Sequence, residues 1–238
     1  MLELKDISFT IRNGETEKRI LNSINLVIED DTFTVITGPN GSGKSTLAKI
    51  IAGIEKPSSG SILLDGADIT GMDITQRARR GIGFAFQQPI RFKGITIKEL
   101  IELAAGKQLS AEEACGYLSE VGLCAAEYVN REMDAKLSGG ELKRIEIAML
   151  LARNVSVSIF DEPEAGIDLW SFQNLIDVFR KLRNAGKRSV VIISHQERIL
   201  DIADTIVLLS GGEITARGNR ADILPGLMDG FDTCRFCK

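Results

Sequence analysis

The sequence predicts an α/β domain with a mainly parallel sheet, an antiparallel β subdomain at its N-terminal end and an inserted α-helical subdomain. Residues 1–37 have the patterns of strands. Between residues 88 and 154 the pattern changes to that of helices. After residue 155 apolar strands alternate with an amphipathic helix, which is typical of a parallel sheet. Together these three observations predict the fold class.

The first third of the chain is expected to hold four strands and one helix. Alternating apolar positions at 20–28 indicate a half-buried strand. Leu47, Ile50 and Ile51 have helical spacing, and Gly53 is placed to end that helix. In order, the expected elements are strands at 2–11, 20–28 and 32–37, the helix ending at Gly53, and a strand at 61–65.

The rest of the chain is expected to be a helical insert followed by the second half of the sheet. Ser110, with a glutamate three residues later, forms a capping box that starts a helix, and a long helix follows Ser138. The other expected elements are strands at 81–86, 155–160 and 189–193, helices at 96–105 and 169–182, and a hairpin of 205–209 with 213–216.

Length and charge narrow the functional classes. The chain has 238 residues, of which 44% are hydrophobic, enough to bury one full core. We therefore treat 1–238 as a single domain, with the helical subdomain at about 88–154 and a C-terminal tail at 226–238. A net charge of −4 offers no diffuse basic surface, so nucleic acid is not an expected partner. No apolar run approaches the roughly 18 residues of a membrane helix.

A phosphate-binding pattern, G-x-x-x-x-G-K-[ST], lies between an apolar strand and a periodic helix. Its glycines let backbone N–H groups surround phosphate oxygens, Lys44 is expected to neutralise the outer phosphates, and Ser45 to reach Mg²⁺. This predicts a P-loop (RecA-like) core with ATP and Mg²⁺ as cofactors, which favours a cytoplasmic location. The predicted nucleotide-binding residues here are Gly38, Pro39, Asn40, Gly41, Ser42, Gly43, Lys44, Ser45 and Thr46.

Two carboxylates follow the strand at 155–160. Asp161 and Glu162 stand at its carboxyl end, which is the usual ligand edge of an open α/β sheet. Asp161 is expected to orient the Mg²⁺ shell. Glu162 is expected to polarise an attacking water as general base. The alternative is a pair of solvated acids that end a strand.

Gln87 and His195 also follow strands. Gln87 ends the strand at 81–86 and begins the helical insert, so its amide is predicted to touch the metal shell and take part in catalysis; a plain strand cap is the alternative. His195 is the only histidine and follows the strand at 189–193. A lone histidine is usually structural, but at this edge its imidazole can donate to a γ-phosphate oxygen and hold water and Glu162 in register.

A second glycine-rich helix start provides another anion site. Exposed N–H groups at such a start favour negative charge, although the pattern alone often marks a simple cap. Ser138, Gly139, Gly140 and Glu141 are therefore predicted to bind nucleotide. The helix that follows has Leu142, Ile145, Met149 and Ala152 on one face.

Over its whole length the chain resembles an ABC-type ATPase domain. In that family two domains pair head to tail, and each ATP lies between the Walker A loop of one and the signature of the other. The resemblance implies a homodimer, or a dimer with a homologous ATPase, and adds Asp168 to the predicted site. The matching motifs are 38–46 for Walker A, Gln87 for the Q-loop, 137–141 for the signature, 157–162 for Walker B with its base, 165–168 for the D-loop and His195 for the switch histidine.

Two positions depart from the family pattern. Glu141 stands where the family often has glutamine, which should be tolerated because Ser138 and the glycines make the phosphate contacts. The aromatic residue that normally stacks on adenine is missing, with Ile11 at about its place and Phe9 nearby. Weaker affinity or looser base selectivity is expected.

The partner is predicted from shorter stretches. Residues 77–87, 138–144 and 194–200 are similar to the ATPase subunit of the Suf iron–sulfur cluster assembly machinery, which implies a soluble Suf-like scaffold protein as partner. Pro163, after the acid pair, is more common in transporter ATPases. The alternative is therefore the ATP-binding subunit of a membrane transporter, with a transmembrane permease as partner and a place on the cytoplasmic face of the membrane.

The chain has four cysteines. Cys234 and Cys237 could donate two thiolates to zinc or an iron–sulfur cluster, but two ligands do not complete a site, and an unpaired thiol pair is the plainer interpretation. Cys115 and Cys124 lie in helical patterns and are expected to pack internally.

Overall fold

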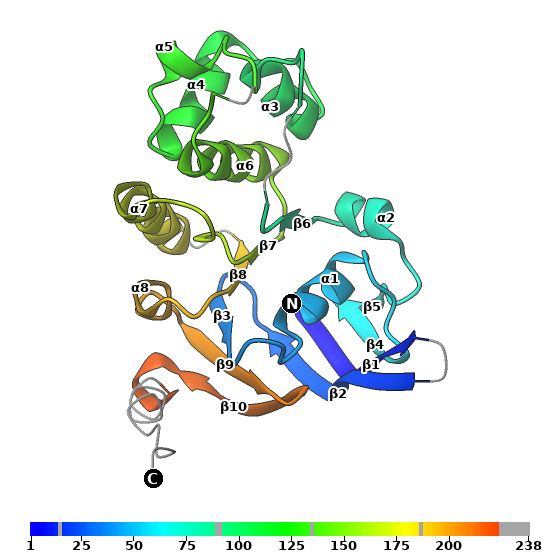
Figure 1. Cartoon of the computed structure of the whole chain (residues 1–238). Coiled ribbons are helices and arrows are strands. Elements are labelled where there is room, and N and C mark those ends of the chain that lie inside the picture. The colour runs from blue at the N-terminus through cyan, green and yellow to red at the C-terminus, as the bar shows by residue number, and fades with distance from the viewer. Residues whose placement is uncertain (14–15, 89–91, 134–135, 186–187, 224–238) are drawn as a thin grey trace.

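The computed structural model describes residues 1–13, 16–88, 92–133, 136–185 and 188–223 (Figure 1). Within them the strands form two sheets, one of six strands and one of four. The predicted tail at 226–238, with Cys234 and Cys237, lies outside the described residues. In the described part no helix is long and apolar enough to cross a membrane.

The larger sheet has the strand order β10-β9-β3-β8-β7-β6. Every neighbouring pair is parallel except β9 with β10, which confirms the predicted mainly parallel sheet. β3, β7 and β8 are buried along their whole length, because the sheet is covered on both faces, and this explains their continuous apolar runs. The strands are β3 (Phe33–Thr37), β6 (Ile82–Ala85), β7 (Val157–Asp161), β8 (Ser189–Ile193), β9 (Thr205–Ser210) and β10 (Glu213–Asn219).

The smaller sheet is antiparallel and has the order β2-β1-β4-β5. It confirms the expected N-terminal β subdomain, although β1 and β2 are longer than expected because their pairing extends as far as Asn13 and Thr16. Register shifts interrupt that pairing between Leu4 and Thr10. The strands are β1 (Leu2–Asn13), β2 (Thr16–Ile28), β4 (Ser59–Leu64) and β5 (Ala67–Asp68).

Helices cover the sheets and form the insert, which Figure 1 shows as a separate layer of α3 to α6 beyond the edge of the larger sheet. Three short helices, α2, α5 and α8, were not expected, because four to six residues hold too few turns to give a periodic signal. The helices are α1 (Lys44–Ala52), α2 (Ile74–Arg79), α3 (Ile97–Ala105), α4 (Ala111–Glu120), α5 (Ala125–Tyr128), α6 (Gly139–Arg153), α7 (Leu169–Ala185) and α8 (Glu197–Leu200).

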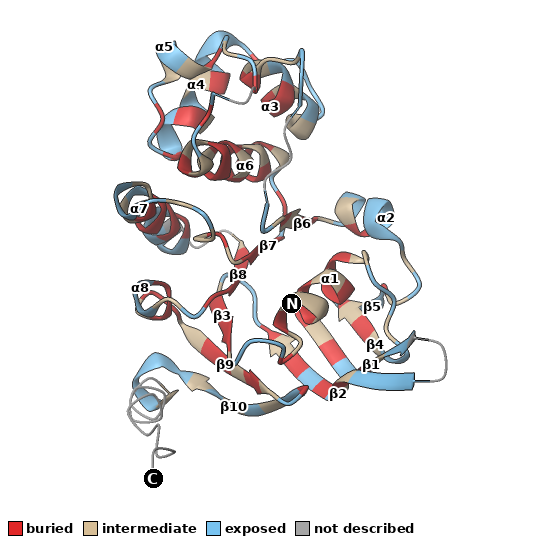
Figure 2. Ribbon diagram, viewed as in Figure 1, coloured by how far each residue is buried: buried red, intermediate tan, exposed pale blue. Residues whose placement is uncertain are grey.

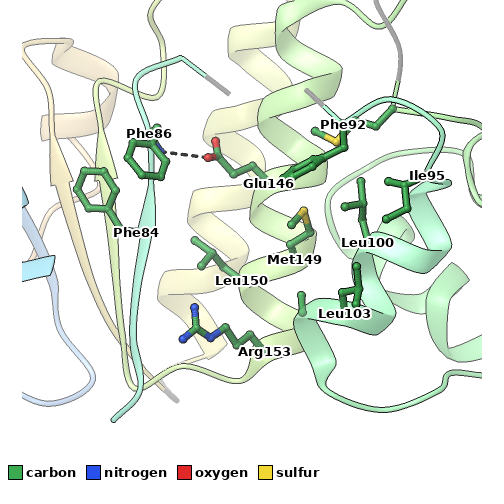
Figure 3. Close-up of a pocket in the computed structure, with 12 residues that line it drawn as sticks. Phe84, Phe86, Phe92, Ile95, Leu100, Leu103, Glu146, Met149, Leu150 and Arg153 are labelled. Atoms are coloured by element: carbon green, nitrogen blue, oxygen red, sulfur yellow. Dashed lines mark hydrogen bonds between the residues drawn. The ribbon is translucent and has the colours of Figure 1, made fainter. Parts of the chain in front are cut away.

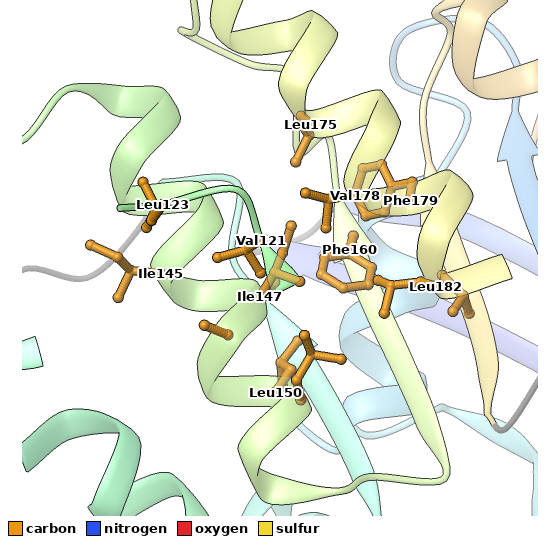
Figure 4. Close-up of a cluster of buried hydrophobic side chains, with 14 of the residues drawn as sticks. Val121, Leu123, Ile145, Ile147, Leu150, Phe160, Leu175, Val178, Phe179 and Leu182 are labelled. Atoms are coloured by element: carbon orange, nitrogen blue, oxygen red, sulfur yellow. The ribbon is translucent and has the colours of Figure 1, made fainter. Parts of the chain in front are cut away.

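Two hydrophobic clusters hold these layers together. One lies around α1 and joins it to both sheets through Leu47, Ile50 and Ile51. The other joins the opposite face of the larger sheet to α6 and α7, and in it Phe160 meets Phe179 edge-on with ring centroids 5.2 Å apart (Figure 4). Figure 2 shows that burial is concentrated along these central strands and the helix sides that face them.

Helix α6 is buried on more than the one face expected from its apolar spacing. Ile147, Leu150 and Leu151 are buried in addition to the predicted Leu142, Ile145 and Ala152, whereas Met149 is half-buried. The reason is that α6 packs against α3 and α4 on one side and α7 on the other. Even Lys143 is only 3% exposed.

Candidate nucleotide site

Four strands of the larger sheet carry the predicted site residues at their carboxyl ends. β3 leads into the loop 38–43, β6 is followed by Gln87, β7 ends with Asp161, and β8 is followed by His195. Because β3, β8, β7 and β6 run parallel as neighbours, these ends lie along one edge of the sheet. The phosphate loop, the acid pair, Gln87 and His195 are therefore gathered on the same edge.

The loop after β3 folds closely around Lys44. The Lys44 ammonium donates hydrogen bonds to Gly38 O at 2.8 Å and Pro39 O at 2.9 Å. Gly38 has φ +143°, and a β-carbon there would lie 1.9 Å from Leu209 O, so only glycine fits. Burial lowers the pKa of Lys44, and the nearby acid pair opposes this. The ammonium therefore lies inside the loop.

The loop and the start of α1 fit a triphosphate. Gly43 occupies the N-cap with φ +100°, and no side chain caps the helix, so the N–H groups of its first turn have no side-chain acceptor. Ser42 Oγ is buried and has no hydrogen-bond partner among the described residues. A buried hydroxyl, helix-terminal N–H groups and a lysine are together suited to bind an anion.

Ser45 and Asp161 form the part of the site that suits a divalent cation. Ser45 Oγ donates a hydrogen bond to Asp161 Oδ1 at 2.9 Å. Asp161 belongs to β7 itself, not to the position after the strand, and is 4% exposed. Desolvation raises its pKa, and the Ser45 hydrogen bond opposes this. Hydroxyl and carboxylate oxygens are ligands that Mg²⁺ prefers, and a Mg²⁺ held here would stabilise charge on phosphate oxygens.

Among the described residues, no group of three or more His, Cys, Asp or Glu side chains could hold a metal ion by itself. Mg²⁺ usually takes only one or two protein ligands and completes its shell with water and substrate phosphates. The Ser45–Asp161 pair is consistent with that mode of binding.

Gln87 and Glu162 contact each other across neighbouring strands. Gln87 Nε2 donates a hydrogen bond to Glu162 Oε2 at 2.7 Å. Glu162 has φ +45°, a left-handed conformation that residues other than glycine rarely adopt, and its N–H donates to Ile193 O at 3.0 Å. Strained backbone at a ligand-binding edge is typical of functional residues. The geometry gives a carboxylate in a fixed position, which is what a general base requires.

His195 is exposed just beyond β8. The turn that presents it is fixed by Ser194, which is fully buried. Ser194 Oγ donates to Glu164 Oε1 at 2.5 Å and accepts the Gln196 N–H at 3.0 Å. Burial raises the pKa of Glu164, while the Ser194 hydrogen bond and the His195 charge oppose this. His195 and the acidic segment after β7 therefore lie close together.

The predicted second anion site starts α6. Ser138 and Glu141 form a capping box: Ser138 Oγ accepts the Glu141 N–H at 3.3 Å, and Glu141 accepts the Ser138 N–H. Glu141 also accepts a hydrogen bond from Tyr128 OH. Both contacts are internal, so the Glu141 carboxylate is held by groups of its own chain, and the hydroxyl hydrogen of Ser138 remains available to an anion.

The two signature glycines allow close approach of the first turn of α7 and of the segment before it. A β-carbon at Gly140 would lie 2.4 Å from Ser171 Cβ, and one at Gly139 would lie 2.9 Å from Gly166 O. Asp168 caps α7, because its Oδ1 accepts the N–H groups of Trp170 and Ser171, both at 3.0 Å. None of the hydrogen bonds or ion pairs in the described part joins 138–141 to 38–46.

Comparison with known proteins identifies the family. The ABC transporter family matches residues 21–165. An uncharacterised ABC transporter ATP-binding protein of Methanocaldococcus jannaschii is 37% identical over 231 residues, which cover 94% of this chain and 90% of that protein. A putative ABC transporter ATP-binding protein of Pyrococcus horikoshii is 33% identical, covering 97% of this chain and 88% of that protein. The chain belongs to the ABC transporter ATPase family.

Solved structures agree with this assignment. The dimeric structure of an ATP-binding cassette in a post-hydrolysis state, bound to ADP and Pi, matches with a TM-score of 0.82 and 29% identity, covering 92% of this chain and 99% of that one. A nucleotide-free cassette from an ABC transporter matches with a TM-score of 0.79. The ABC ATPase is thus an ATP-hydrolysing enzyme that uses ATP with Mg²⁺, as the sequence predicted.

Among the residues that the structure describes, Ile11 stands at the place expected for the adenine-stacking residue and is not aromatic. Ile11 is exposed, and Phe9 is half-buried against the core of the β subdomain rather than free to stack on a base. Weaker or less selective binding of the adenine base remains a prediction.

Sequence reasoning missed several polar residues that support the site. Glu164, Lys143 and Glu146 have pKa values shifted by burial and contact the segments that carry Ser194 and Gln87. The available signal was weak, because a charged residue on a helix is usually solvated. The prediction for Cys124 was wrong: it is exposed, whereas Cys115 is partly buried against the core as expected.

Proposed function

We propose that this ABC ATPase binds and hydrolyses ATP between two cassettes paired head to tail, either as a homodimer or with a homologous ATPase. In this proposal 1–238 acts as one ATPase domain with a helical part at about 88–154. The observation that carries it is that one chain has two anion-binding helix starts, at α1 and α6, with no hydrogen bond or ion pair between them in the described part. A site completed by a second protomer makes ATP binding close the dimer.

Each predicted residue has a role in this composite site. Residues 38–46 would hold the phosphates, and Ser45, Asp161 and Gln87 would face Mg²⁺. Glu162 would act as general base, and His195 would donate to the γ-phosphate. Ser138, Gly139, Gly140, Glu141 and Asp168 would come from the other protomer. The hydrogen bond between Gln87 and Glu162 and the Ser45–Asp161 pair support these roles.

The first test is Glu162→Gln. Glutamine keeps the size of the side chain but removes the base, so the variant should bind ATP, remain as a closed dimer and lose turnover by about 10²–10⁴-fold. Phosphate release and size-exclusion chromatography with ATP and Mg²⁺ measure both effects. Full turnover by this variant would contradict the general-base role.

For the work that hydrolysis drives, we propose a transmembrane permease, with this subunit on the cytoplasmic face of the membrane. The relatives named above are described as ABC transporter ATP-binding proteins, which supports this alternative better than the Suf-like scaffold. The Suf prediction rests only on the short similar stretches at 77–87, 138–144 and 194–200.

A groove between the end of β6 and the helical insert is the surface on which we propose that the permease docks (Figure 3). It has a volume of about 560 Å³ and is mostly apolar, with Glu146 and Arg153 as its charged members. Leu103 on its rim is 69% exposed and Phe92 is 39% exposed, which is unfavourable unless a partner covers them. Phe86 lines the groove and is the neighbour of Gln87, so a short amphipathic segment of a permease bound there would lie beside the nucleotide site.

Leu103→Asp tests the groove, with Ile74→Asp as the matched control. Ile74 is also an exposed apolar residue, at 42%, but lies on α2 outside the groove. A tagged chain is purified from detergent-extracted membranes and from the soluble fraction, and its bound partner is identified by mass spectrometry. We expect a multi-span membrane protein to be purified together with the unmodified chain and with Ile74→Asp, but not with Leu103→Asp. A soluble iron-containing scaffold would instead support the Suf alternative.

A further inference from the structure

A buried lysine and a half-buried glutamate lie next to each other on α6, outside the set of predicted site residues. Lys143 is 3% exposed, and its Nζ lies 3.7 Å from Glu146 Oε2, one helical turn further on. Burial lowers the pKa of Lys143 and raises that of Glu146. Such a pair is expensive to desolvate and persists only where it makes further hydrogen bonds.

Those further hydrogen bonds all go to one residue, Phe86. The Phe86 N–H donates to Glu146 Oε1 at 3.0 Å (Figure 3), and Lys143 Nζ donates to Phe86 O. Phe86 follows the last residue of β6, so the β-ladder does not continue through it. Lys143 and Glu146 therefore bind the backbone C=O and N–H of Phe86, the first residue after β6.

The next residue along the chain is Gln87, whose amide contacts Glu162. A pocket of about 320 Å³ is lined by Gln87 and Lys143 together with Gly139 and Gly166. Fixing the Phe86 peptide groups fixes the position from which the Gln87 side chain extends. It also ties that position to α6, the helix that Ser138 caps. Glu146 in addition lines the apolar groove.

We propose that Lys143 and Glu146 are positioning residues that hold the Phe86 backbone and so keep Gln87 in register with Glu162. Neither residue touches the nucleotide in this account; both act through Gln87. The pair makes α6 and the end of β6 move as one unit. This inference rests on the proposed function, because it assigns a task to the Gln87–Glu162 contact.

The experiment compares turnover and ATP affinity in four variants. Glu146→Ala leaves the Phe86 N–H unpaired and should lower kcat about tenfold, the loss expected for one charge-assisted hydrogen bond, with the Kd for a fluorescent ATP analogue unchanged. Glu146→Gln keeps an acceptor oxygen and should restore kcat to within about threefold of the unmodified chain. Gln87→Ala alone and Gln87→Ala with Glu146→Ala complete a double-mutant cycle.

The cycle distinguishes positioning from plain stabilisation. If Glu146 acts through Gln87, adding Glu146→Ala to Gln87→Ala causes no further loss of kcat. A loss equal to the product of the two single effects would overturn the proposal, as would full turnover by Glu146→Ala. Glu146→Gln keeps the hydrogen bond, so its kcat can be measured even if Glu146→Ala fails to fold. A tenfold loss of kcat in Glu146→Gln would also count against the proposal.

Glu102→Ala is the matched control. Glu102 likewise accepts a backbone N–H, that of Leu109 at 3.0 Å, and pairs with Lys98 at 3.6 Å, but it lies on α3 away from the nucleotide edge. It should leave kcat unchanged. Glu162→Gln, measured in parallel, distinguishes a failure of the proposed nucleotide site from a failure of the Lys143–Glu146 inference. If it retains full turnover, the proposed site is wrong; if it is inactive while Glu146→Ala is fully active, only the Lys143–Glu146 inference is wrong.

Discussion

Lys44 shows how a single residue depends on its surroundings. Burial of its ammonium lowers its pKa, and the nearby Glu162 and Asp161 carboxylates oppose that shift. Two loop carbonyls accept its hydrogen bonds. Its position could be predicted, because the glycine pattern around it is local and only glycine fits at Gly38. The left-handed backbone conformation of Glu162 and its hydrogen bond with Gln87 could not be predicted, because they depend on the pairing of β6 with β7.

Lys44→Ala should weaken ATP binding about 10- to 100-fold, the loss of one charge-assisted contact to phosphate. Titration with a fluorescent ATP analogue measures the Kd. Lys56→Ala, which removes an exposed lysine in the turn before β4, is the control and should not change it. Equal affinities in the two variants would contradict the assigned phosphate loop.

At the scale of elements, buried charged side chains join helices that the sequence pattern treats as separate. Arg77 of α2 is fully buried and binds the end of α1, donating to Ile50 O at 2.5 Å and Ile51 O at 2.9 Å. It also donates to Thr70 O and Met72 O. The capping box at Ser110 and the buried strands β3, β7 and β8 were predictable from local spacing. Arg77, Lys143 and Glu146 were not, because burial of a charge is decided by distant segments.

Arg77→Met should destabilise the protein by about 2–4 kcal/mol, because it leaves buried carbonyls without a donor. Urea unfolding followed by circular dichroism measures this. Arg79→Met, two residues further along the same helix but exposed, should stay within about 0.5 kcal/mol. If both variants unfold at the same urea concentration as the unmodified chain, Arg77 does not hold α1 in place.

At the scale of the whole molecule, an exposed apolar pair lies beside the signature. Trp170 is 82% exposed and Leu169 67% exposed at the start of α7, next to the place where Ser171 meets Gly140. Trp170 is also the only tryptophan in the chain. The fold class and the ATPase family were predictable from ordered motifs, whereas an exposed surface such as this one has no local sequence signal for what binds it, and we propose that a second protomer covers it.

Trp170 therefore provides a signal for dimer closure. In the Glu162→Gln variant, addition of ATP and Mg²⁺ should shift the fluorescence emission of Trp170 to shorter wavelength, because a partner protomer covers the side chain. The shift should grow together with the fraction of the protein that elutes as a dimer in size-exclusion chromatography. The same variant with Lys44→Ala should show no shift. A dimer that forms while the emission stays unchanged would place the contact surface elsewhere.

If each ATP is shared between two protomers, mixing two variants that are each defective in a different half-site must restore turnover. Lys44→Ala disables one half-site, and Ser138→Asp disables the other by adding a negative charge while keeping a good N-cap. Each variant alone should be inactive. Mixed in equal amounts, random pairing gives dimers with one intact site and restores up to about a quarter of the normal turnover. No recovery on mixing, or full activity of Ser138→Asp alone, would contradict the account.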